Sequence, residues 1–149
     1  MLRNRIVNGQ KASDATYVAH TDLKRGMGVA KGVDGKTAFV SSAEMGGMFN
    51  VFVVDRDNLP EGIETVYTDR PDTFFDDIKE GSYVILRPYV VGESFYTDQY
   101  TAGAEVDGTN LCAGVDGKWN KTTNEVSKFI SRGTETVAGV QMLIVEVVM

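Results

Sequence analysis

The pentapeptide GVDGK occurs twice in this chain of 149 residues, at residues 32–36 and again at residues 114–118. Asp34-Gly35 lies between the strand-like segments GMGVAKG and KTAFVS, and Asp116-Gly117 lies between LCAG and KWNK. An Asp-Gly pair in this setting is a strong hairpin signal, because a type I′ turn needs positive φ at both central residues. The sequence therefore predicts two hairpins of the same geometry, with left-handed glycines at Gly35 and Gly117.

The residues around the two pentapeptides are only loosely similar. Each copy follows a Thr-Asp pair and a stretch of small residues, but the distance from that pair to the pentapeptide differs between the copies. An internal duplication would explain the repeat. We interpret it at this level as local convergence on a favourable turn, because one short match with unequal spacing does not define a repeated unit.

The rest of the chain also favours β structure. FNVFVVD (residues 49–55), SYVILRPYVV (82–91) and GVQMLIVEVVM (139–149) are rich in β-branched and aromatic residues. DTFFDDIKEG (72–81) is the one predicted helix, since Asp72 can cap its start and Gly81 can end it. We therefore predict an all-β protein, a mainly antiparallel small barrel or β-tulip-like sandwich with one short helix.

The net charge of −6 comes from one segment of the chain. Residues 55–80 hold nine acidic and three basic residues, and the remainder is balanced. We expect this acidic insert to project from a single β domain of residues 21–149, with Phe74, Phe75 and Ile78 anchoring it. The negative overall charge argues against nucleic-acid binding through phosphate neutralisation.

Residues 1–20 lack a clear periodicity and are expected to form an extended N-terminal arm. Basic residues precede its first acid, Asp14, and its apolar residues are scattered. Such an arm cannot offset the entropy of ordering by itself, so we expect it to be mobile in the free protein. In an assembly it would pair with an exposed strand edge of a partner. The candidate partner contacts are Leu2, Arg3, Arg5, Ile6 and Val7.

The sequence contains no catalytic or metal-binding signature. His20 is the single histidine, and it has no second histidine or nearby cysteine with which to share a zinc ion. Cys112 is the single cysteine, so no disulfide can form within the chain. Phe95, Tyr96 and Tyr100 could form a platform for a sugar or cover one end of a barrel, and we favour the second interpretation. We therefore expect no catalytic residue, no cofactor and no metal ion.

Four segments of the C-terminal half resemble bacteriophage head decoration proteins, which cement the capsid shell. These segments are IKEGSYVILRP (78–88), SFYTDQYTAGAEV (94–106), NLCAGVDGKW (110–119) and VQMLIVEVV (140–148). Their order is similar to that of small β-barrel or β-tulip decoration folds, in which a Gly-rich hairpin precedes a closing strand. The resemblance covers about the last 70 residues, and it does not supply the acidic insert.

The resemblance implies a non-enzymatic virion structural protein that stabilises a phage capsid by binding across neighbouring major capsid proteins. Its partners would be the major capsid protein or further copies of itself in a homo-oligomer, with no nucleic acid and no membrane. It would be assembled in the host cytoplasm and lie on the capsid exterior. The alternatives are a phage tail or head-completion protein, a carbohydrate-binding β module and a small hydrolase with an unrecognised site.

Overall fold

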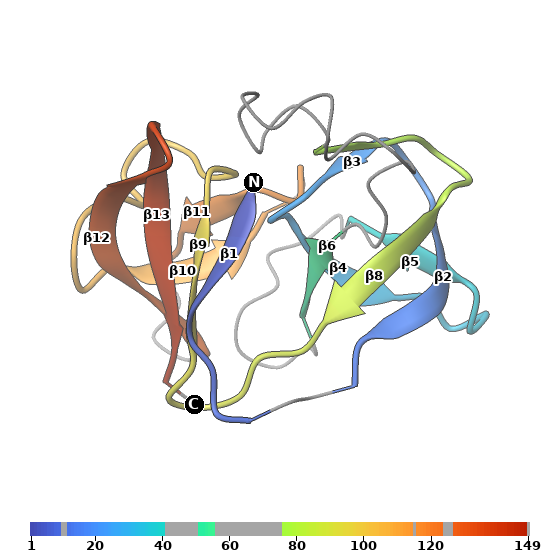
Figure 1. Ribbon diagram of the computed structural model, residues 1–149, viewed down its shortest axis with the longest axis horizontal. Helices are drawn as coiled ribbons and strands as arrows, with labels where there is room; N and C mark the ends of the chain where they lie inside the picture. The colour runs from blue at the N-terminus through green and yellow to red at the C-terminus, as the bar shows by residue number, and fades with distance from the viewer. Residues whose placement is uncertain (10–11, 41–50, 56–75, 115, 124–126, 149) are drawn as a thin grey trace.

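The computed structural model describes residues 1–9, 12–40, 51–55, 76–114, 116–123 and 127–148. These residues form β-strands and turns, and there is no helix among them. They fall into two β units that lie side by side (Figure 1), together with a two-stranded ribbon of β3 (Leu23–Lys24) and β7 (Asp77–Ile78). The predicted all-β class and the small barrel are therefore confirmed.

The first unit, which we call the barrel, is a closed sheet of five strands in the order β2-β5-β4-β6-β8. β2 pairs in parallel with β5, and every other neighbouring pair is antiparallel. The strands are β2 (Asp14–Ala19), β4 (Gly28–Lys31), β5 (Thr37–Phe39), β6 (Phe52–Asp55) and β8 (Tyr83–Arg87). The apolar core inside consists of Ala19, Leu23, Met27, Val29, Ala38, Val54, Ile78, Val84 and Leu86.

The second unit is a six-stranded sheet in the order β1-β9-β13-β12-β10-β11. The strands are β1 (Leu2–Ile6), β9 (Ser94–Thr97), β10 (Asn110–Ala113), β11 (Trp119–Lys121), β12 (Phe129–Val137) and β13 (Val140–Val147). The sheet curls until β11 meets the segment that follows β9. Tyr100 forms a parallel bridge with Trp119 there, and the Trp119 N–H donates to the carbonyl of Gln99 at 2.9 Å. Strands β9 to β13 thus surround a second core.

The two units share one strand topology. In chain order, β2, β4, β5, β6 and β8 of the barrel correspond to β9, β10, β11, β12 and β13 of the second unit. In each unit the first strand pairs antiparallel with the fifth, and its C-terminal end or extension runs parallel to the third. In each unit the GVDGK turn joins the second strand to the third.

The registers of two strand pairs agree as well, when each residue is counted from the pentapeptide of its own unit. The matching pairs are Val29–Phe52 with Leu111–Phe129, and Val54–Leu86 with Ser131–Val145. The register beside the turn differs by one residue, since Lys31 pairs with Ala38 whereas Ala113 pairs with Trp119. An agreement of order and direction over five strands, with the register of two strand pairs, is still more than two turns of the same type require. We therefore interpret the chain as a duplicated five-stranded unit, in place of the local convergence expected from the sequence.

The predicted left-handed glycines are confirmed, because φ is +69° at Gly35 and +79° at Gly117. The predicted type I′ geometry is wrong, since neither Asp34 nor Asp116 has a positive φ. In each pentapeptide the N–H of the second glycine donates to the carbonyl of the first, at 3.1 Å in the first copy and 2.9 Å in the second. Each aspartate carboxylate accepts the N–H of the following lysine, which favours this turn over type I′.

The two turns differ in their surroundings. Among the described residues, a Cβ added at Gly35 would meet no atom within 4 Å. A Cβ added at Gly117 would lie 3.2 Å from side-chain atoms of Met27 and Val40. The Gly117 carbonyl also accepts the N–H of Gly28 at 2.9 Å, so the second turn packs against the barrel.

The predicted helix over residues 72–81 is wrong where it can be compared with the structure. Asp76 and Ile78 are buried whereas Asp77 between them is exposed, and this period of two is that of a strand. Ile78 pairs with Leu23 in the ribbon. Phe74 and Phe75, the other two predicted anchors, lie outside the described residues.

The expected mobile arm over residues 1–20 is also corrected. Its described residues include β1, which pairs with β9, and β2, which is a strand of the barrel. Asp14 at the start of β2 forms an ion pair with Lys31 of β4, with 2.6 Å between Oδ2 and Nζ. Hydrogen bonds from Lys31 and Thr16 lower the pKa of Asp14 from 3.8 to about 2. Long-range pairing and this ion pair therefore hold the segment in place.

Replacing Gly35 by Ala should lower the free energy of unfolding by about 1 kcal/mol, because a side chain disfavours the left-handed region by roughly that amount. Gly117→Ala should cost about 2 kcal/mol, since its Cβ also crowds the barrel. Urea unfolding of both variants measures the difference. Equal losses would show that the packing of the second turn contributes nothing to stability.

Asp14→Asn should weaken the protein by about 0.5–1 kcal/mol near pH 6, the range for a partly exposed ion pair. Because the folded-state pKa of Asp14 is depressed, its contribution is present above about pH 4 and is lost as the pH falls toward about 2. Unfolding curves from pH 6 to pH 2 should therefore converge for the variant and the unchanged protein. A gap that persists at pH 2 would argue against the ion pair as the cause.

Candidate interaction surface

The two side chains with most catalytic potential are separate in the structure. Cys112 is buried in β10, and its thiol donates to the Asn120 carbonyl at 3.7 Å. His20 follows β2 and is exposed. Within the described part of the chain, no three His, Cys, Asp or Glu side chains gather in a way that could hold a metal ion. The distinctive polar features are instead a buried charge cluster and an open strand edge.

The three aromatic residues considered for a sugar platform do not share a surface. Phe95 is fully buried, with its ring centroid 5.6 Å from that of Trp119. Tyr100 packs against the same core. The Tyr96 hydroxyl donates to Glu135 at 2.9 Å on an exposed part of the sheet. Phe95 and Tyr100 therefore belong to the core of the second unit.

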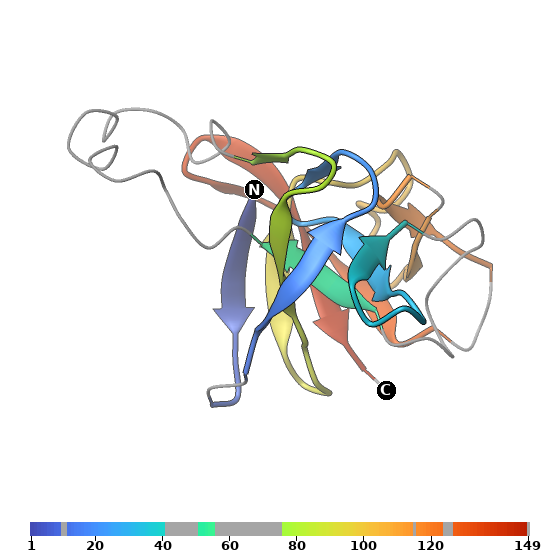
Figure 2. The same ribbon diagram turned by 90° about the vertical axis from the view of Figure 1, so that its right-hand side faces the viewer.

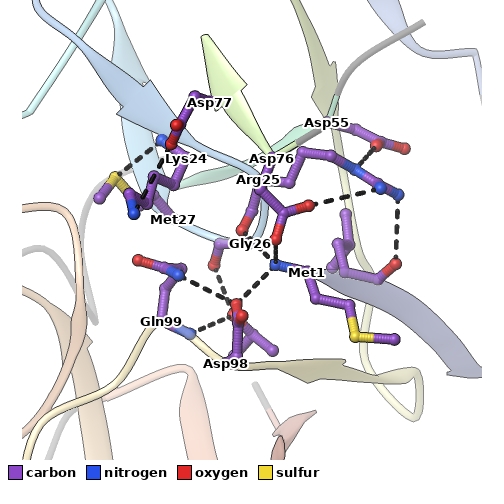
Figure 3. Close-up of polar contacts among 12 residues, drawn as sticks. Met1, Lys24, Arg25, Gly26, Met27, Asp55, Asp76, Asp77, Asp98 and Gln99 are labelled. Atoms are coloured by element: carbon purple, nitrogen blue, oxygen red, sulfur yellow. Dashed lines mark hydrogen bonds and ion pairs between the residues drawn. The ribbon is translucent and has the colours of Figure 1, made fainter. Parts of the chain in front are cut away.

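The α-ammonium group of Met1 lies in the interior, where it meets carboxylates from two parts of the fold (Figure 3). It donates to Asp76, to Asp98 at 2.6 Å and to the Arg25 carbonyl at 3.2 Å. Asp76 immediately precedes β7 of the ribbon, whereas Asp98 immediately follows β9 of the second unit. Since a buried charge without partners is strongly unfavourable, these contacts fix the start of β1.

Two arginines extend this charge cluster. Arg25 Nη1 lies 3.5 Å from Asp76 Oδ1, and its Nε lies 2.9 Å from Asp55 Oδ1. Asp55 also pairs with Arg87. Burial raises the pKa of the Asp76 carboxyl, and the Met1 ammonium only partly opposes this effect. Asp55 and Asp76 of the acidic insert are therefore buried in ion pairs. The predicted projection of the insert over residues 55–80 is therefore wrong for Asp55 and Asp76, and residues 56–75 lie outside the described residues.

β1 is the outermost strand of the second unit, and one of its edges pairs with no other strand in the described ranges (Figures 1 and 2). Of the candidate contacts, Arg3 and Arg5 are exposed, and Ile6 and Val7 are exposed by 47% and 41%. Leu2 is only 5% exposed and belongs to the core of the second unit, so its prediction as a partner contact is wrong. The other four candidates lie on the surface, where Arg5 Nη1 also donates to the Ser94 hydroxyl at 3.4 Å.

The charges on β1 influence which strand could pair with its open edge. Two copies of β1 paired antiparallel about Asn4 would place Arg3 of one copy opposite Arg5 of the other. Like charges directly opposite each other destabilise a strand pair, and opposite charges stabilise it. The edge therefore favours an acidic partner strand over a second copy of β1.

The turn residues have structural roles that are separate from this edge. The side-chain hydrogen bonds of Asp34 and Asp116, among the described residues, stay within their own turns. Gly35 lies on the open turn and Gly117 on the turn that packs against the barrel. The structure thus brings Arg3, Arg5, Ile6 and Val7 together along one segment. The predicted turn residues are not part of that surface.

The chain matches no protein-family model, no curated protein and no solved structure. In the part of the chain that the structure describes, no helix is long and apolar enough to cross a membrane. The function is therefore inferred from the duplicated strand order and from the chemistry of the surfaces.

Asp98→Asn should lower the free energy of unfolding by about 2–3 kcal/mol, because the buried ammonium loses one of its two carboxylates. Asp77→Asn is the matched control: Asp77 is 66% exposed, and its ion pair with Lys24 spans 3.6 Å. Such an exposed pair contributes at most about 1 kcal/mol. Urea unfolding at neutral pH compares the two variants. Equal losses would show that the ammonium cluster does not stabilise the fold.

Proposed function

We propose that this protein is a non-enzymatic virion structural protein that decorates a phage capsid and stabilises it by binding across neighbouring major capsid proteins. The duplicated five-stranded unit is the observation that carries this proposal. A capsid shell repeats one protein many times, so a chain with two related units can contact two neighbours at once. Linking two contacts in one chain raises the overall affinity through effective concentration.

The proposed stabilisation follows from mass action. A protein that binds the assembled shell, and not its separate subunits, shifts the equilibrium toward the shell. The resemblance of segments 78–88, 94–106, 110–119 and 140–148 to head decoration proteins supports the same function. The location that fits it is the capsid exterior.

The open edge of β1 is the proposed contact with one capsid subunit. An extended segment of the partner would add to this edge through backbone hydrogen bonds. Acidic side chains on that segment would meet Arg3 and Arg5, and its apolar side chains would cover Ile6 and Val7. Because the arginines are exposed, this contact should weaken as salt rises. The charges on β1 have an alternative explanation, since charged edge strands also protect proteins from aggregation. Binding of particles through this edge is expected only if the edge is a capsid contact.

Co-sedimentation with assembled phage heads that lack this protein tests the proposal. The protein should pellet with assembled heads, should not associate with separate capsid subunits, and should be released progressively as salt is raised. Arg5→Glu should lower the affinity at least about tenfold, equivalent to about 1.4 kcal/mol. Removing residues 1–12 is less informative, since Met1 and Leu2 are buried.

Lys36→Glu is the matched control for Arg5→Glu, because it makes the same charge reversal on the exposed first turn. It should leave binding unchanged. A protein that fails to pellet with assembled heads at low salt would contradict the proposed function. Binding that resists both salt and Arg5→Glu would contradict the role of the β1 edge.

A further inference from the structure

A second surface feature, an apolar groove, lies at the junction of the two units. Its lining includes Phe52 of β6, Phe129 of β12, and Val90 and Val91 of the loop between β8 and β9. Among the described residues that line it, the one charged side chain is Lys128. The groove is open to solvent, and it is distinct from the open edge of β1.

The duplication explains how the groove is built. Phe52 and Phe129 occupy corresponding positions, because each pairs with the residue three places before its own GVDGK segment. Pro88 and Val147 also correspond, since each lies two residues beyond a matched pair of the last strand. All four line the groove. Both copies of the unit therefore contribute the same part of their fold to one surface.

The groove leaves aliphatic side chains in contact with water. Val90 is 45% exposed and Val91 is 56% exposed. Their loop is attached to the second unit, because the Gly92 N–H donates to the Val147 carbonyl at 2.8 Å. Adjacent exposed aliphatic residues beside an apolar groove are typical of a surface that another molecule covers.

The charge of the groove indicates the chemistry of that molecule. The Lys128 side chain is half-buried, and within the described residues no carboxylate pairs with its ammonium group. A cation at the wall of an apolar groove becomes less hydrated when the groove is covered, so it then needs an opposite charge from the partner. An anionic group next to aliphatic side chains satisfies both requirements.

We propose that this groove binds an extended segment of another protein that presents aliphatic side chains beside a carboxylate. The aliphatic side chains cover Val90 and Val91, and the carboxylate pairs with Lys128. This inference does not depend on the proposed capsid function, because it defines the chemistry of a bound segment and not the particle that carries it.

Selection of a random displayed peptide library on the full-length protein tests the inference, followed by fluorescence anisotropy with labelled copies of the enriched peptides. Enriched peptides should combine aliphatic residues with Asp or Glu. Val91→Asp should lower their affinity at least about tenfold. Lys128→Glu should reverse the charge preference, so that selection on this variant enriches Lys and Arg in place of acids.

Val33→Asp and Lys36→Glu are the matched controls, since they make the same chemical changes on the exposed first turn, outside the groove lining. They should leave peptide affinity within about twofold. No enrichment above the blank, or equal binding by Val91→Asp and the controls, would overturn the inference. So would acidic peptides that bind Lys128→Glu unchanged. A dimer in sedimentation velocity that Val91→Asp dissociates would show instead that a second copy covers the groove.

Discussion

A single buried cation, the α-ammonium group of Met1, is the constraint on which the junction of the two units depends. Its carboxylates come from residues on either side of that junction, Asp76 and Asp98. Next to it, the Gly26 carbonyl accepts the Trp119 indole N–H at 2.8 Å and the Thr97 hydroxyl at 3.0 Å. Only glycine fits there, since a Cβ would lie 2.3 Å from Thr97 Oγ1. Backbone groups and paired charges therefore join the two apolar cores.

The duplicated units keep a common frame but differ in what fills and surrounds it. Corresponding interior positions stay buried while their size changes, as with Leu86 in the barrel and Val145 in the second unit. The added strand β1 belongs to the second unit alone. The two units consequently present different surfaces on similar frames. Such a molecule suits neighbouring targets that are related in structure but not related by exact symmetry, because each unit can be adapted to its own neighbour.

Local chemistry explains which parts of the fold could be predicted from the sequence. Strong runs of β-branched residues and the glycines at 35 and 117 determine their own conformations, so these elements were recognised. The pairing of β1 and β2 depends on strands far away in the chain, and no local pattern reveals it. Asp76 and Asp98 are two of 21 acidic residues, and only the fold shows that they meet one ammonium group. For the same reason, the sequence placed Leu2 at the surface and did not indicate the groove at Lys128.

The open copy of the repeated turn makes the molecule tolerant of change at one place. Val33 is fully exposed there, and the Gly35 N–H and the Asp34 carboxylate bond to groups within the turn. Foreign sequence inserted between Val33 and Asp34 would extend into solvent and leave the barrel strands paired, since exposed loop tips accept insertions. The other copy is closed to such engineering, because its Gly117 carbonyl holds β4. The same pentapeptide sequence thus forms two turns with different uses. One is an exposed turn that can carry a grafted epitope, and the other is a turn packed against the barrel.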